Sequence, residues 1–98
     1  MTYTLFFSED ALGDIEESYK WYEEQKHGLG EDFLESIYSG ADKICANPDL
    51  YQFQYKEQRA AIVSGFPYRI FYFTEGNRVI IQGVLNMSRD PQVWKNRK

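Results

Sequence analysis

The sequence predicts a single α+β domain over residues 1–98, in which an N-terminal helical hairpin packs on one face of a small antiparallel sheet. Two observations predict this fold class. Apolar residues recur at helical spacing in two consecutive N-terminal segments, whereas the C-terminal part consists of short runs rich in β-branched and aromatic residues. The chain is 98 residues long and 43% apolar, which is enough for one core and leaves little for a second domain. The expected order of elements is β-α-α-β-β-β.

The first expected element is a short strand, in which Tyr3, Leu5 and Phe7 alternate with Thr2, Thr4 and Phe6. Ser8 and two acidic residues follow the strand. A serine caps the free N–H groups of a helix, and acids in the first turn are favoured by the helix dipole. The predicted helix that begins here carries apolar residues at steps of three and four, namely Leu12, Ile15, Tyr19 and Tyr22.

A second helix is expected after the glycine-containing turn at residues 26–32. Its apolar positions again recur at helical spacing: Phe33, Leu34, Ile37, Tyr38, Ala41, Ile44 and Cys45. Asn47-Pro48 ends it, because proline disfavours helical geometry in the residue before it. Two helices joined by a short turn form a hairpin.

Three strands of an antiparallel meander are expected at residues 60–63, 68–74 and 79–85. Gly65, Pro67 and the turn at residues 75–78 separate them. The middle strand has large apolar residues on both faces, which indicates a central position in the sheet. Arg69 is the charged member of this strand, and a charge there requires either a partner or an exposed cleft.

Charge is distributed unevenly along the chain. Residues 1–58 contain thirteen acids and four lysines, whereas residues 59–98 contain seven basic residues and two acids. One interpretation is that the basic part meets an anionic surface while the acidic part stays solvated or meets a basic partner. The other is that helices collect glutamate and strands collect arginine.

Several classes of site are disfavoured by composition. The single cysteine, Cys45, cannot form an internal disulfide, and no spacing of cysteine with histidine builds a zinc site. The paired acids of the first helix read as a solvated face rather than a metal site, and His27 reads as a solvated turn residue. The aromatic pair Trp21 and Tyr22 either lines a groove for a partner or completes the hairpin core. No export or membrane-spanning segment is recognisable, so we expect a cytoplasmic protein without metal or cofactor.

The order of these segments resembles the RelE/ParE superfamily of toxins from bacterial type II toxin-antitoxin modules, also known as plasmid stabilisation modules. The resemblance extends over nearly the whole chain: the opening strand, the acidic hairpin ending at Asn47-Pro48, FPYRIFYF (66–73), VIIQGVLN (79–86) and SRDPQVWKNR (88–97). It implies a small sheet with the hairpin packed against it. It also implies a cognate antitoxin whose C-terminal segment wraps the toxin and blocks its working face.

The superfamily divides into two activities, and RelE-like members cut mRNA in the ribosomal A site. By this resemblance Arg69 and Arg89 are the catalytic candidates, since arginine can stabilise the developing phosphorane charge. Other groups are replaced: Ala60 and Ile62 stand where many relatives have lysines. Asn86 and Trp94 stand at positions of a histidine and a tyrosine. If the chain is an enzyme, it is a ribosome-dependent endoribonuclease with a depleted site.

ParE-like members instead bind DNA gyrase and poison it, which requires an adhesive surface rather than an acid or a base. Arginine and tryptophan are the residues that most often anchor interfaces, so we expect Arg59, Trp94 and Arg97 to bind the target. The alternative is that Trp94 packs on the core and Arg89 pairs with Asp90 or the acidic helices. The sequence therefore favours a gyrase-binding toxin. The mRNA endonuclease and a non-toxic, partner-binding descendant remain open.

Overall fold

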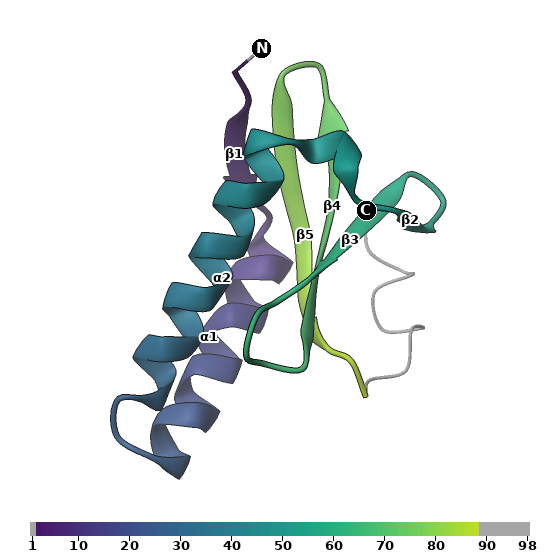
Figure 1. The fold of residues 1–98 in the computed structure, drawn as a ribbon. Coiled ribbons are helices and arrows are strands. Elements are labelled where there is room, and N and C mark those ends of the chain that lie inside the picture. The colour runs from purple at the N-terminus through teal and green to yellow at the C-terminus, as the bar shows by residue number, and fades with distance from the viewer. Residues whose placement is uncertain (1, 89–98) are drawn as a thin grey trace.

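A computed structural model describes residues 2–88 of the chain. The predicted fold class is confirmed: two helices pack on one face of a sheet, as Figure 1 shows. The sheet has five strands in the order β1-β5-β4-β3-β2. The elements are β1 (Thr4–Phe7), α1 (Glu9–Gln25), α2 (Leu29–Ala46), the 3-10 helix η1 (Pro48–Leu50), β2 (Phe53–Tyr55), β3 (Gln58–Ile62), β4 (Tyr68–Glu75) and β5 (Arg78–Asn86).

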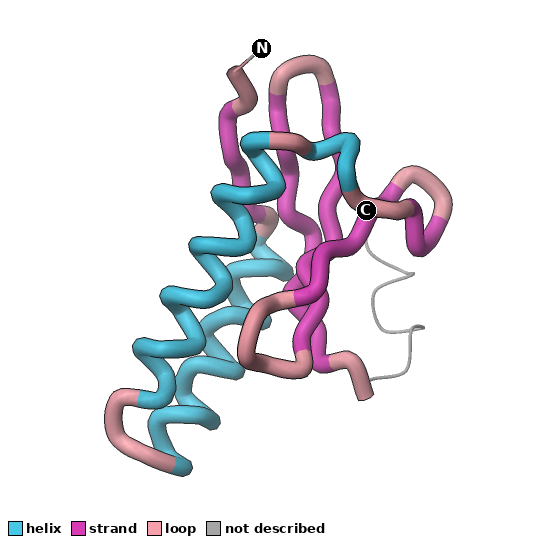
Figure 2. The backbone as a smooth tube through the Cα atoms, viewed as in Figure 1, coloured by secondary structure: helices cyan, strands magenta, loops and turns pink. Residues whose placement is uncertain are grey.

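Both helices begin and end through contacts that the residue types explain. The Ser8 side chain accepts a hydrogen bond from the Ala11 N–H at 3.1 Å, which confirms the predicted cap of α1. Gly28 precedes α2 with φ at 91°, a left-handed conformation that suits glycine. Helix α2 ends at Ala46, and its C-cap Asn47 precedes the buried Pro48. The turn between the helices lies at the opposite end of the molecule from the β4–β5 turn (Figure 2).

The sheet differs from the predicted one in two details. Strand β2 was not predicted; its first residue, Phe53, pairs with Arg59 of β3. The prediction of antiparallel pairing holds for β2–β3, β3–β4 and β4–β5, but β1 pairs with β5 in parallel. The helices carry the chain from β1 at one edge of the sheet to β2 at the other edge, and this path has no local signal in the sequence.

A β-bulge in β5 decides which side chains face the helices. Phe71 pairs with Gly83 and Tyr72 with Ile81, so Gln82 is the extra residue. Val79, Ile81 and Val84 therefore all join the core beneath the helices, although strict alternation would place Val84 on the other face. The core continues through α1 and α2 with Ile15, Phe33, Ile37 and Ile44, each at most 4% exposed.

Candidate functional site

Arg69 lies in the central strand on the sheet face opposite the helices. Its neighbours in register are Ile62 of β3 and Leu85 of β5, and its side chain is half-buried. Among residues 2–88 no hydrogen bond or ion pair holds the Arg69 guanidinium. The predicted central position is confirmed by the strand order. The strand thus presents a positive charge on an otherwise apolar stretch of sheet.

Two residues lie in register with Arg69 on the neighbouring strands, and neither of these described residues carries a group that could transfer a proton. Ile62 is 67% exposed, and Leu85 forms a small buried cluster with Phe71, against which Ala60 packs. A general acid or base must reach the reacting group at hydrogen-bond distance. Arg69 can therefore act here as an anchoring or charge-stabilising group, and its two direct neighbours in the sheet, Ile62 and Leu85, contribute apolar surface.

Arg59 lies in β3, next to the edge strand β2, and its side chain is held by contacts within the chain. Its guanidinium donates hydrogen bonds to the carbonyl oxygens of Asp49 and Tyr51, and it lies 3.7 Å from the Asp49 carboxylate. The guanidinium carbon also lies 4.0 Å from the centre of the Phe53 ring. These contacts fix the segment after α2 against β2 and β3. A role in target binding stays a prediction for Arg59.

Tyr72 fastens the same segment to the sheet from the central strand. The side chain is fully buried, and its hydroxyl donates a hydrogen bond to the Pro48 carbonyl at 2.5 Å. Burial raises the pKa of Tyr72 to about 12, because the phenolate would lose its hydration. The phenol therefore acts as a neutral hydrogen-bond donor.

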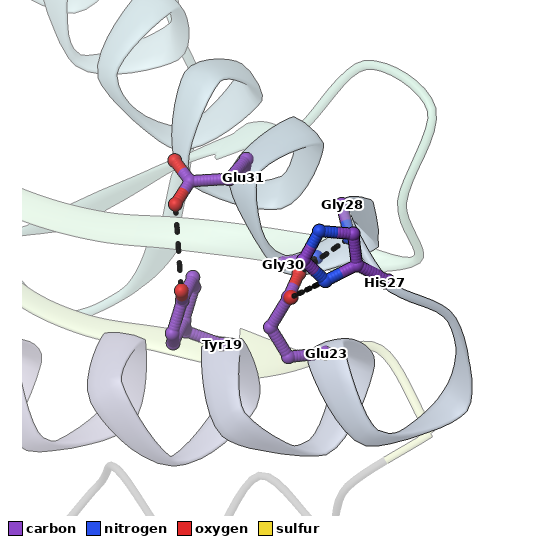
Figure 3. A network of polar contacts seen from close by, with 6 residues as sticks. All are labelled: Tyr19, Glu23, His27, Gly28, Gly30 and Glu31. Atoms are coloured by element: carbon purple, nitrogen blue, oxygen red, sulfur yellow. Dashed lines mark hydrogen bonds and ion pairs between the residues drawn. The ribbon is translucent and has the colours of Figure 1, made fainter.

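The turn between the helices is organised by Glu23. Its carboxylate accepts hydrogen bonds from the N–H groups of Gly28 at 2.9 Å and Gly30 at 2.8 Å, and it lies 3.4 Å from His27 (Figure 3). The Gly28 N–H is the main cause that lowers the Glu23 pKa. Glu23 of α1 thus caps the N-terminus of α2. This role was not predicted, because Glu23 belongs to a different helix from the one that it caps. His27 remains exposed, as predicted.

A groove borders the end of α1, the loop before β4 and the end of β5. It has a volume of about 680 Å³, and Trp21, which is 54% exposed, lines it. Tyr22 also borders the groove, but its ring packs against the core, where it stacks with Phe33 with ring centres 5.2 Å apart. Burial raises the Tyr22 pKa to about 12. Trp21 thus lines the groove, whereas Tyr22 contributes both to the groove and to the core.

The family model for the ParE toxin of type II toxin-antitoxin systems, parDE, matches residues 5–91. This chain belongs to the ParE toxin family. The structure is similar to the solved "Chromosomal ParDE TA system from P. aeruginosa", with a TM-score of 0.73 and 15% sequence identity. That likeness covers 87% of this chain and 96% of the other, and at this identity it is a likeness of fold. None of the curated proteins compared with this chain matches it.

Membership of the ParE family confirms the predicted superfamily and implies an antitoxin partner. Three of the predicted site residues of this ParE-family toxin, Arg89, Trp94 and Arg97, lie outside the described residues. In the described part of the chain, no group of three or more His, Cys, Asp or Glu side chains is placed to hold a metal ion. No helix within residues 2–88 is long and apolar enough to cross a membrane.

Proposed function

We propose that this ParE-family toxin acts by binding DNA gyrase, and that its antitoxin neutralises it by covering the working surface. The family match carries the proposal. The surroundings of Arg69 support it, because the side chains in register with this arginine are aliphatic. A poison that works by adhesion needs no acid or base.

The open face around Arg69 has the properties of an interface anchor. An arginine among apolar neighbours offers a charged handle together with aliphatic area, the combination that recurs where truncation costs most binding energy. Ile62 extends this surface with a side chain that is 67% exposed. In this proposal Arg89, Trp94 and Arg97 add contacts from the C-terminal segment, and Arg59 contributes from the sheet edge.

A supercoiling assay tests the proposal. Purified toxin should inhibit the conversion of relaxed plasmid to supercoiled plasmid by gyrase, with accumulation of cleaved DNA. Arg69→Ala should raise the concentration needed for inhibition by about tenfold or more, as expected for the loss of an interface anchor. Arg78→Ala is the matched control, since Arg78 is exposed and pairs with Glu75 at the other end of the sheet. Unaltered supercoiling at saturating toxin would refute the proposal.

The ribosome-dependent endoribonuclease is the second candidate, and Arg69 is the observation that favours it. A central-strand arginine with no partner among residues 2–88 could stabilise a phosphorane. New mRNA ends after induction, absent in Arg69→Ala, would establish the nuclease. Absence of growth arrest in any form would instead indicate the non-toxic, partner-binding descendant.

A further inference from the structure

The groove beside Trp21 is formed by three segments that meet at one end of the sheet. Helix α1 supplies Lys20, Trp21 and Glu24, the loop before β4 supplies Pro67, and Tyr68 and Asn86 begin and end the neighbouring strands. Tyr68 and Asn86 are direct partners in the β4–β5 ladder. The floor of the groove is therefore formed by the paired ends of β4 and β5, and its wall is the C-terminal half of α1, from Glu17 onward.

The Trp21 side chain is supported by an aromatic residue, Tyr22, that packs on the core. The Tyr22 ring meets the indole edge-on, with ring centres 5.0 Å apart and planes at 84°. Tyr22 itself packs against Phe33, Phe66 and Tyr68. Trp21 as a residue is nevertheless 54% exposed to water. A rigidly supported, exposed tryptophan is the residue type that most often anchors an interface, because it loses little conformational freedom on binding.

The negative charge of helix α1 favours a cationic ligand in the groove. Helix α1 carries seven acids and one lysine, and the whole hairpin from Glu9 to Ala46 carries eleven acids and three lysines. Glu24 lies one helical turn beyond Trp21 in the lining of the groove. An indole face beside a carboxylate attracts a guanidinium or ammonium group by cation–π and Coulomb interactions. The same field repels phosphates.

We propose that the groove binds a cationic segment of the partner antitoxin, with an arginine or lysine side chain on the Trp21 indole and an apolar side chain against Pro67 and Tyr68. The inference rests on the toxin-antitoxin function and specifies the chemistry of the partner.

Calorimetric titration of the full chain with two peptides tests the proposal. One is a short amphipathic peptide in which arginine and leucine recur at helical spacing, and the other has glutamine at every arginine position. The arginine peptide should bind at least about fivefold more tightly than the glutamine peptide. Trp21→Ala should weaken its binding by a similar factor, and Trp21→Phe, which keeps an aromatic face, should restore part of the loss. Circular dichroism verifies that each variant is folded.

Glu24→Gln and Glu9→Gln form the matched charge pair. Both remove one exposed carboxylate from α1, but Glu9 lies in the first turn and outside the groove. Glu24→Gln should weaken the arginine peptide by about two- to fivefold, and Glu9→Gln should not. Equal effects of the two variants, or equal binding of the two peptides, would overturn the proposal. Concentration-dependent self-association that Trp21→Ala abolishes would also overturn it, because a second copy would then be the occupant.

The outcome is separable from that of the gyrase proposal. If the toxin inhibits supercoiling but binds neither peptide, only the proposal of a cationic antitoxin segment in the groove is refuted. If the arginine peptide binds through Trp21 but supercoiling is unaltered, only the proposal that the toxin binds gyrase is refuted.

Discussion

Replacing Tyr72 by phenylalanine should destabilise the domain through the loss of one hydrogen bond. The Tyr72 hydroxyl donates to the carbonyl of Pro48, and both residues are buried. Phenylalanine keeps the packing of the ring, including its edge contact with Tyr51, whose ring centre lies 6.3 Å away. The variant therefore isolates the polar contact that joins the segment after α2 to the central strand.

The magnitude follows from the burial of both partners. A protein hydrogen bond contributes about 0.5–1.5 kcal/mol net, and an acceptor left unpaired in the interior costs about 1–3 kcal/mol. Because the Pro48 carbonyl lies beneath a fully buried ring, water does not replace the hydroxyl without rearrangement. We expect the free energy of unfolding to fall by about 1–2 kcal/mol. In a domain of this size that corresponds to a Tm lower by roughly 4–16 °C.

Urea unfolding followed by circular dichroism measures the loss. The midpoint should move to lower urea while the slope m stays unchanged, since the same surface is exposed on unfolding. Tyr38→Phe is the matched control: Tyr38 is 46% exposed, and its ring contacts Phe7. That variant should stay within about 0.5 kcal/mol of the parent. A Tyr72→Phe variant as stable as the control would refute the assigned role of the hydroxyl.

Further predictions concern pH and the helical hairpin. The pKa of Tyr22 and of Tyr72 is raised by burial to about 12, so their contribution to stability is complete below pH 10 and is lost as pH rises toward 12; unfolding curves across this window measure the loss. The lowered Glu23 pKa stabilises the fold above the ordinary carboxyl value of 4.5, and Glu23→Gln should reduce both the Tm at pH 7 and its decline in acid. Gly30→Ala should destabilise, because a Cβ would lie 2.8 Å from the Tyr19 ring and 2.9 Å from its carbonyl oxygen. Gly13→Ala, which meets no atom within 4 Å, should stabilise α1 by about 0.5–1 kcal/mol in thermal unfolding.

The helices were predictable because their signals are local. Ser8 caps α1, and Asn47-Pro48 ends α2, as expected from the residue types alone. Strand β2 was missed because three residues are too few to establish a period, and its pairing depends on a turn at Lys56, whose φ is 49°. The parallel pairing of β1 with β5 depends on the path of the whole hairpin. No window of the sequence contains that information.

In the candidate site, too, the features with a local signal in the sequence were predictable and the others were not. The alternation of β4 placed Arg69 on the face opposite Tyr68 and Tyr72, and the structure has it there. The anchoring of Arg59 could not be predicted, because its hydrogen-bond acceptors are backbone carbonyls whose positions follow from η1. The exposure of Trp21 could not be predicted either, because helical spacing places this residue at the boundary between core and solvent. Contacts that depend on backbone position or on elements far apart in sequence lack a local signature.

The groove and Arg69 lie back to back at one end of the sheet. Tyr68 lines the groove on the helical face, and Arg69, the next residue of β4, faces the other side because successive side chains of a strand alternate. A partner segment that fills the groove and passes over the loop at Pro67 therefore reaches the Arg69 face within a few residues. Under the two proposals together, a single antitoxin segment would gain affinity from the groove and, where it continues past Pro67, would cover the proposed target surface at Arg69. Trp21→Ala should then release toxicity in the presence of antitoxin, whereas Arg69→Ala should reduce toxicity in its absence.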